Sequence, residues 1–179
     1  MKTQPRSPDP VTDPDAYRAM LLGLLGDDDP AAVQSGTPAE VRALVAEAGQ
    51  DLRTAPAPGE WSVVEVFGHI SDAETVMSGR YRWILAQDKP PIPGYDQDLW
   101  ASRLRHREAD PAELIALFEA LRTANLALWR RTPVEERARY GVHSERGPES
   151  YELTFRLLAG HDRFHLAQAH RTLEQVRSD

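Results

Sequence analysis

Apolar residues recur three or four positions apart along most of the chain, which is the period of helices that bury one face. Alternation of apolar and polar residues, the pattern of half-buried strands, is nearly absent. We therefore expect an all-α protein, an antiparallel bundle of four main helices. The pattern places helices from Pro14 to before Gly26, from Thr37 through Ala48, from Ser62 to about Leu85, over 110–132 and from Thr154 to about Arg177, with one short helix within 96–104.

Capping residues indicate where three of these helices start. Asp13 stands before the first helix as an N-cap, and Thr37 with Glu40 has the spacing of a capping box. Ser62 with Glu65 repeats that spacing ahead of a strongly apolar run. Each start is thereby predicted within a residue or two.

The length of 179 residues suits one domain with a full core, which we place at 14–177. Residues 1–13 are rich in Pro, Asp, Thr and Ser, so we expect a disordered leader. They lack the apolar core of a signal peptide, and no later stretch approaches the length of a transmembrane helix, so we expect no membrane partner.

Composition removes several kinds of chemistry. The absence of cysteine excludes disulfides, thiolate metal ligands and a cysteine nucleophile, and it is compatible with a cytoplasmic location. A formal net charge of −7 argues against nucleic acid as a partner. The run RLRHR at 103–107 is the one contrary feature, and we expect it to be a solvated loop.

Two histidines four residues apart are the main candidate site. His161 and His165 lie on one helix face together with Leu157 and Leu158, so both imidazoles should point toward the core. His69 lies at the edge of the apolar face of another helix. Three neutral histidines leave one coordination position open, which is the ligand set of catalytic zinc sites.

Further polar residues near these histidines have more than one interpretation. Asp72 and Gln168 share a side with the proposed ligands and could orient a ligand, and Asp72 could also move a proton. Helix-surface solvation is the alternative for Asp72, and a hydrogen-bonded core residue is the alternative for a lone buried histidine. We expect Asp162 to be a surface or cap-bonding residue, and His106 and His143 to be solvent-exposed. Gly68 and Gly160 are either packed closely or tolerated at the surface. Tyr95 and Trp100 either line a pocket mouth or pack the proline loop.

The segments WSVVEVFGHISDAE, PGYDQDLWA and ELTFRLLAGHDRFHLAQ resemble the DinB-like superfamily of metal-binding four-helix bundles. The resemblance covers roughly residues 14–177. It implies a metal triad carried by His69, His161 and His165. Phe164 departs from the family pattern, because many relatives have another histidine there. This should not remove a ligand, because position 164 is displaced by about 60° from His161 around the helix.

The same resemblance implies zinc or nickel as the metal and frequent homodimers. It also implies a small-molecule substrate, since relatives include S-transferases that use low-molecular-weight thiols, a mycothiol-dependent maleylpyruvate isomerase and metal-dependent hydrolases. Because this chain has no cysteine, thiol chemistry would need a thiol from solution.

Two classes of function therefore remain open. The first is a metal-dependent enzyme, a thiol S-transferase or a hydrolase. The second is a non-catalytic metal-binding or stress-response protein in which the ion links helices. A substrate-shaped pocket beside an open coordination position favours the enzyme, whereas a fourth protein ligand or a closed site favours the structural role.

Overall fold

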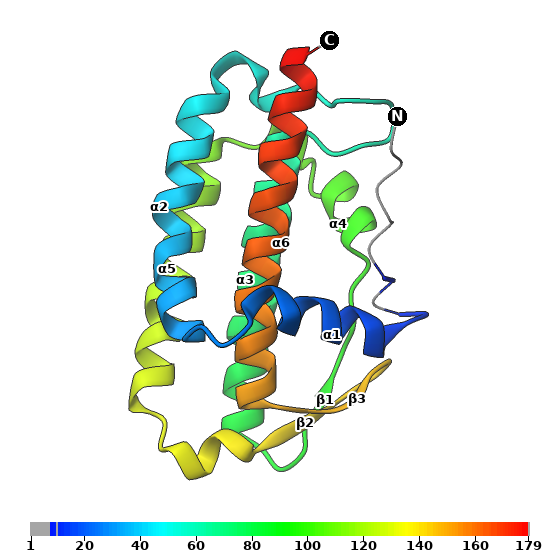
Figure 1. Ribbon diagram of the computed structural model, residues 1–179. Helices are drawn as coiled ribbons and strands as arrows, with labels where there is room; N and C mark the ends of the chain where they lie inside the picture. The colour runs from blue at the N-terminus through cyan, green and yellow to red at the C-terminus, as the bar shows by residue number, and fades with distance from the viewer. Residues whose placement is uncertain (1–7, 10, 179) are drawn as a thin grey trace.

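Four long helices form a bundle, a fifth helix lies across its side, and a small sheet lies near one end (Figure 1). The computed structural model describes residues 8–9 and 11–178. The predicted all-α four-helix bundle is confirmed. In chain order the elements are α1 (Pro14–Leu25), α2 (Pro30–Ala48), a 3-10 helix (Gly49–Arg53), α3 (Val63–Ala86), β1 (Pro91–Ile92), α4 (Gln97–Arg103), a 3-10 helix (His106–Glu108), α5 (Pro111–Arg131), a 3-10 helix (Val134–Ala138), β2 (Tyr140–His143), β3 (Gly147–Ser150) and α6 (Tyr151–Ser178).

The bundle helices α2, α3, α5 and α6 are arranged so that each packs against two others. The colour gradient in Figure 1 shows that α2 and α6 run in one direction and α3 and α5 in the other. The pairs α3–α6 and α2–α5 are therefore antiparallel, and the pairs α2–α6 and α3–α5 are parallel. Helix α1 lies across α6, so α6 is covered on three sides.

Two of the three predicted helix starts are observed. The side chain of Asp13 accepts a hydrogen bond from the backbone N–H of Ala16, and Ser62 and Glu65 form a complete capping box at α3. The Asp9 side chain caps a turn just before α1. The predicted leader falls partly outside the described residues, which begin at residue 8 and omit residue 10.

The predicted start of α2 at Thr37 is wrong. Asp29 caps the helix at Pro30, and Pro38 lies inside it. An internal proline removes the N–H that would bond the carbonyl four residues earlier, here that of Gln34. Arg122 of α5 donates to that carbonyl over 3.0 Å instead, so the lost bond is replaced by a tertiary one.

The predicted start of α6 at Thr154 is also wrong, by three residues. Strand β3 leads directly into the helix at Tyr151, and the Ser150 hydroxyl accepts from the backbone N–H of Leu153. The sheet has the order β1–β2–β3, with β1 parallel and β3 antiparallel to β2. Strands of two to four residues are too short to show an alternating pattern in the sequence.

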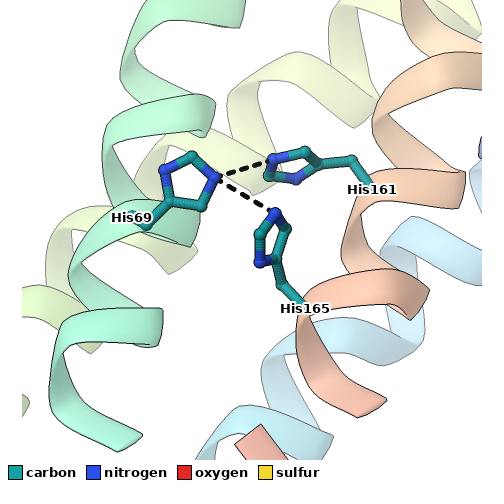
Figure 2. Close-up of side chains that lie close together, drawn as sticks. All are labelled: His69, His161 and His165. Atoms are coloured by element: carbon teal, nitrogen blue, oxygen red, sulfur yellow. Dashed lines mark hydrogen bonds between the residues drawn. The ribbon is translucent and has the colours of Figure 1, made fainter. Parts of the chain in front are cut away.

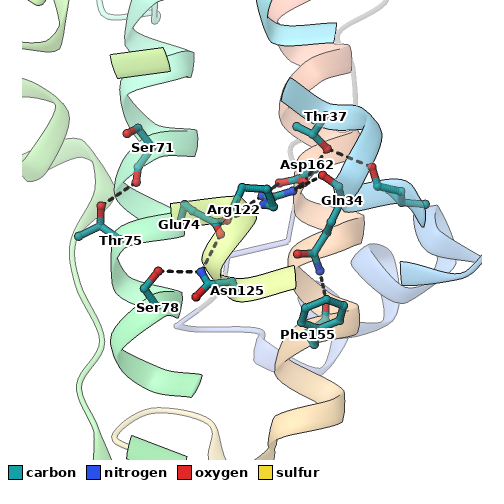
Figure 3. A network of polar contacts seen from close by, with 11 residues as sticks. Gln34, Thr37, Ser71, Glu74, Thr75, Ser78, Arg122, Asn125, Phe155 and Asp162 are labelled. Atoms are coloured by element: carbon teal, nitrogen blue, oxygen red, sulfur yellow. Dashed lines mark hydrogen bonds and ion pairs between the residues drawn. The ribbon is translucent and has the colours of Figure 1, made fainter. Parts of the chain in front are cut away.

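A polar network lies in the middle of the bundle (Figure 3). The Arg122 guanidinium binds Asp162 at 2.5 Å and Glu74 at 2.9 Å, and Asn125 donates to the other Glu74 oxygen at 2.7 Å. All four side chains are 0–1% exposed. The predicted exposure of Asp162 is therefore wrong, because α6 is enclosed by α1, α2 and α3 and has little surface left to present to solvent.

Gly160 permits a close approach of α1 to α6. A Cβ atom added there would lie 2.0 Å from the backbone oxygen of Leu21 in α1, whereas one added at Gly36 on the exposed side of α2 would meet nothing nearer than 3.9 Å. Close packing is thus the correct interpretation for Gly160. It is also correct for Gly68, where an added Cβ would lie 2.3 Å from the His106 ring.

We expect Gly160→Ala to destabilise the protein by about 1–3 kcal/mol, because backbone atoms of α1 must move to relieve the overlap. Gly36→Ala is the matched control and should stabilise by about 0.5–1 kcal/mol through helix propensity alone. Urea unfolding followed by circular dichroism measures both. A Gly160→Ala variant as stable as Gly36→Ala would contradict the packing of α1 on α6.

Candidate metal centre

Three histidines from two helices converge inside the bundle (Figure 2). His69 extends from α3, and His161 and His165 extend from successive turns of α6. The Nε2 atom of His69 lies 3.0 Å from Nε2 of His161 and 3.2 Å from Nε2 of His165. The side chains are buried, and their candidate ligand atoms all lie within 4.8 Å of one another.

Burial keeps these imidazoles uncharged. Desolvation, reinforced by the neighbouring histidines, lowers the pKa of His69 and His161 well below the ordinary value. Desolvation also lowers the pKa of His165, to about 4. Neutral imidazole is the form that binds a metal ion, so the cluster is ready to act as a ligand set at neutral pH.

A glutamine fixes the orientation of His165. The Nδ1 atom of His165 lies 2.8 Å from the side-chain oxygen Oε1 of Gln168. Because this oxygen can only accept, the ring proton is on Nδ1 and the Nε2 lone pair faces the cluster. This is the orienting role expected for Gln168. In the described part of the chain, Nδ1 of His69 and Nδ1 of His161 have no hydrogen-bond partner.

The geometry of the cluster fits a small cation. Three neutral rings cannot all donate and accept among themselves, because His69 Nε2 has at most one proton for two neighbours. Nitrogens bound to zinc at about 2.0–2.1 Å in a tetrahedral arrangement are about 3.3–3.4 Å apart, close to the observed separations. No fourth His, Asp or Glu among the described residues belongs to the group. The histidines therefore offer three ligands and leave room for another.

A cavity opens beside the cluster. It is open to solvent at its mouth, and both His69 and His161 line it. Tyr95 lines it too, and Trp100 packs against Tyr95 with ring centroids 4.7 Å apart. Tyr95 thus lines the pocket, and Trp100 packs against the proline loop that carries Tyr95.

Asp72 does not contact the three histidines. Its carboxylate lies 2.6 Å from Nε2 of His106, whose ring packs over Gly68. The predicted exposure of His106 is wrong, since the side chain is 4% exposed. The glycine is the feature that explains this burial, because it leaves space against α3 for an imidazole. A catalytic role for Asp72 stays a prediction.

The run at 103–107 is partly a contact surface. Arg107 donates to the Glu65 carboxylate at 2.9 Å, which ties this segment to the start of α3, whereas Arg103 and Arg105 are exposed. The predicted solvated loop therefore holds for all three arginines, since Arg107 is exposed as well, and fails for His106.

His143 is also buried, at 2% exposed, and its predicted exposure is wrong. It ends β2 and lies 3.3 Å from Arg80 of α3 in the cavity wall. Sequence reasoning missed Arg80, although a position about three turns after His69 shares its helix face.

We expect Gln168→Ala to weaken metal binding by about 10–100-fold without unfolding the bundle, because His165 would lose the contact that fixes its tautomer. Competition titration with a chromogenic chelator measures the affinity. Gln175→Ala, on the last turn of the same helix, is the control. Equal affinities in the two variants would rule out the orienting role.

A four-helix bundle with three inward histidines beside a cavity is a helical bundle with a candidate metal centre. The sequence comparison identifies its family. The chain belongs to the DinB superfamily, whose family model matches residues 34–169. The predicted resemblance is confirmed.

Curated relatives carry related names. A protein of Oceanobacillus iheyensis, named provisionally as a metal-dependent hydrolase, is 28% identical over 110 residues, which are 61% of this chain and 62% of the relative. YfiT of Bacillus subtilis, with the same provisional name, is 27% identical over 111 residues, again 61% and 62%. The matched segments thus span less than two thirds of these relatives.

The solved structure of Bacillus subtilis YfiT, described as an unusual four-helix bundle, superposes with a TM-score of 0.72 at 22% identity. The match covers 98% of this chain and 93% of YfiT. This likeness concerns the fold.

Among the described residues, no helix of this chain combines the length and apolarity needed to cross a bilayer.

Proposed function

We propose that this chain is a metal-dependent enzyme that hydrolyses a small molecule, with zinc or nickel bound by His69, His161 and His165. The observation that carries the proposal is the convergence of three buried, neutral imidazoles, two of which line a cavity, with no fourth His, Asp or Glu of the described residues in the group. The hydrolase names of the relatives support the same class of reaction.

The residues of the chain have separate roles in this proposal. A divalent ion held by three neutral histidines supplies Lewis-acid chemistry and lowers the pKa of a water or thiol that reaches it. Gln168 holds the ring of His165 in position, and the cavity admits the substrate. Asp72 follows His69 by one turn of α3 and pairs with His106. This pair could exchange a proton with solvent or substrate.

Transfer of a low-molecular-weight thiol is a second candidate for the same site. The cavity reaches the histidines from outside, and the chain has no cysteine that could compete for the metal or attack the substrate. A thiol S-transferase of this kind would bind its thiol from solution.

Metal analysis combined with activity assays tests the proposal. Protein purified without an affinity tag is expected to contain about one zinc or nickel ion per chain. The metal-loaded protein should hydrolyse members of a panel of small esters and amides, or consume an electrophile when a thiol is added, and chelation should abolish either activity. Full activity after the metal has been removed would overturn the proposal.

Turnover, measured together with the effect of chelation on stability, separates the enzyme from the structural alternative. An ion that binds only the folded state stabilises it by mass action, about 4 kcal/mol at a thousandfold excess over the dissociation constant. We expect a lower melting temperature after chelation in either case. Metal-dependent stability with no turnover on any substrate would favour the non-catalytic protein.

The homodimer and the cytoplasmic location belong to the same proposal. Sedimentation equilibrium of the full chain tests the first, with a mass of twice 20.0 kDa expected. Fractionation of the source cells tests the second.

A further inference from the structure

Arg80 lies in the same cavity as the histidine cluster, at some distance from it. It follows His69 by about three turns of α3, roughly 16 Å along the helix axis. Its side chain is 2% exposed and lines the cavity together with His69 and His161. A single molecule in the cavity could therefore contact both.

Among the described residues no carboxylate forms an ion pair with Arg80, although the charge of Glu149 acts on it from a longer distance. The Nη2 atom of Arg80 donates to the carbonyl oxygen of Pro93 at 2.8 Å, and its Nε has no partner within the described part of the chain. Arg122 shows the usual solution for a guanidinium buried equally deeply, because two carboxylates bind it. A buried charge without a partner is costly, and arginine cannot become neutral to avoid that cost.

Glu149 is the acidic residue of the cavity wall whose charge acts on Arg80, but two other arginines bind it directly. Arg18 and Arg146 both bind Glu149, at 3.2 Å and 2.7 Å. The remaining acidic residue of the wall is Glu145, which forms no ion pair with Arg80. Three arginines thus face two glutamates, so the wall has excess positive charge although the whole chain has a formal net charge of −7.

His143 adds a second unmatched donor next to Arg80. The backbone N–H of Glu145 donates to Nδ1 of His143 at 3.2 Å. Burial, with Arg146 and Arg80, lowers the pKa of His143 to about 4, so the ring is neutral and its proton is on Nε2. Nε2 lies 3.3 Å from Nη2 of Arg80. Two donors therefore face each other, and an acceptor placed between them and the cavity would satisfy both.

Apolar side chains line the cavity between this end and the histidine cluster. Ala73 and Met77 come from α3, Leu21 from α1, and Leu157 and Leu158 from α6. The wall is thus apolar in the middle, with neutral metal-ligand candidates at one end and unmatched cationic and N–H donors at the other.

We propose that Arg80 and His143 form an anion subsite that binds the carboxylate of the substrate. The inference rests on the proposed function in one respect, because it places the reacting group of the substrate at the three histidines. The substrate class is then an elongated organic acid, with a carboxylate at Arg80, an apolar middle against Met77 and Leu157, and a hydrolysable or electrophilic group at the cluster. The planar guanidinium matches a carboxylate in shape and charge.

Binding of a matched acid and amide tests the subsite. The probes are 4-phenylbutanoate and 4-phenylbutanamide, titrated by calorimetry into the full chain after chelation, so that no metal ion can bind the carboxylate. Wild type should bind the acid at least about tenfold more tightly than the amide, because hydrogen bonds to charged groups are the strong ones. Arg80→Met should lose this preference, and Arg82→Met, an exposed arginine on the same helix, should keep it.

Several results would overturn the subsite: equal binding of acid and amide by wild type, or a preference that survives in Arg80→Met. If Arg80→Met does not fold, Arg80→Gln keeps N–H donors without the charge, and an unchanged preference there has the same meaning. Zinc content measured on every variant separates the two proposals. Zinc binding without a preference for the acid would contradict the proposed subsite alone. A preference for the acid without zinc binding would contradict the proposed metal-dependent function alone.

Discussion

His161→Ala is expected to remove the bound metal ion, with the affinity for zinc reduced by more than about 100-fold, because loss of a ligand should exceed the effect of removing a residue that only orients one. His161 supplies one of three converging nitrogens, and among the described residues no other His, Asp or Glu stands ready to replace it. Any activity that depends on the ion should fall to the level of the chelated wild type. Metal analysis of the purified variant, together with the activity assay, checks both statements.

His170→Ala is the matched control for this variant. His170 is on the same helix but exposed, on the side away from the cluster. It should keep full metal content and full activity. If His170→Ala lost as much metal as His161→Ala, the ions bound to the chain would lie elsewhere on its surface, and the three buried histidines would be core residues.

Arg122→Met should destabilise the protein by about 3–5 kcal/mol, which lowers the melting temperature by roughly 6–20 °C. The methionine fills much of the same volume, but it leaves the carboxylates of Glu74 and Asp162 buried without their cation. It also leaves the carbonyl of Gln34 without a donor. Thermal and urea unfolding of the purified variant give the loss.

The loss should depend on pH. Burial raises the pKa of Glu74, and Arg122 opposes that rise, so the variant should have a still higher pKa in the folded state. A carboxyl whose folded-state pKa is raised favours folding below its unfolded pKa and loses that contribution as pH increases. The destabilisation should therefore be smaller at pH 5 than at pH 8. Arg130→Met, exposed on the same helix, should change stability by less than about 0.5 kcal/mol at either pH.

The sequence predicted the helices and the candidate ligands where the information was local. Ser62 and Glu65 cap α3 through contacts three residues apart, and the spacing of His161 and His165 determines that they share a face. His69 could be added because the apolar periodicity of its helix is strong. Whether the three histidines bind a metal remains a prediction, although the structure brings them together.

The sequence failed where distant contacts override local preference. Thr37 has the right neighbours for a helix cap, yet it donates to Asp162, 125 positions away. The sequence placed His106 and His143 in loops, where exposure is the usual outcome. In the structure His106 begins a 3-10 helix for which Gly68 makes room, and His143 ends β2 beside Arg80. No pattern of apolar and polar residues shows which loop will return to the bundle.

The bond between Arg122 and the Gln34 carbonyl has a consequence for the stability of α2. Pro38 lies inside α2 and has no N–H, so the backbone hydrogen bond that residue 38 would form within the helix is missing. The donor that replaces it comes from a residue 88 positions later in the chain. An isolated segment with the sequence of α2 lacks this contact, so docking of α5 adds stability to α2 at the position that the proline weakens.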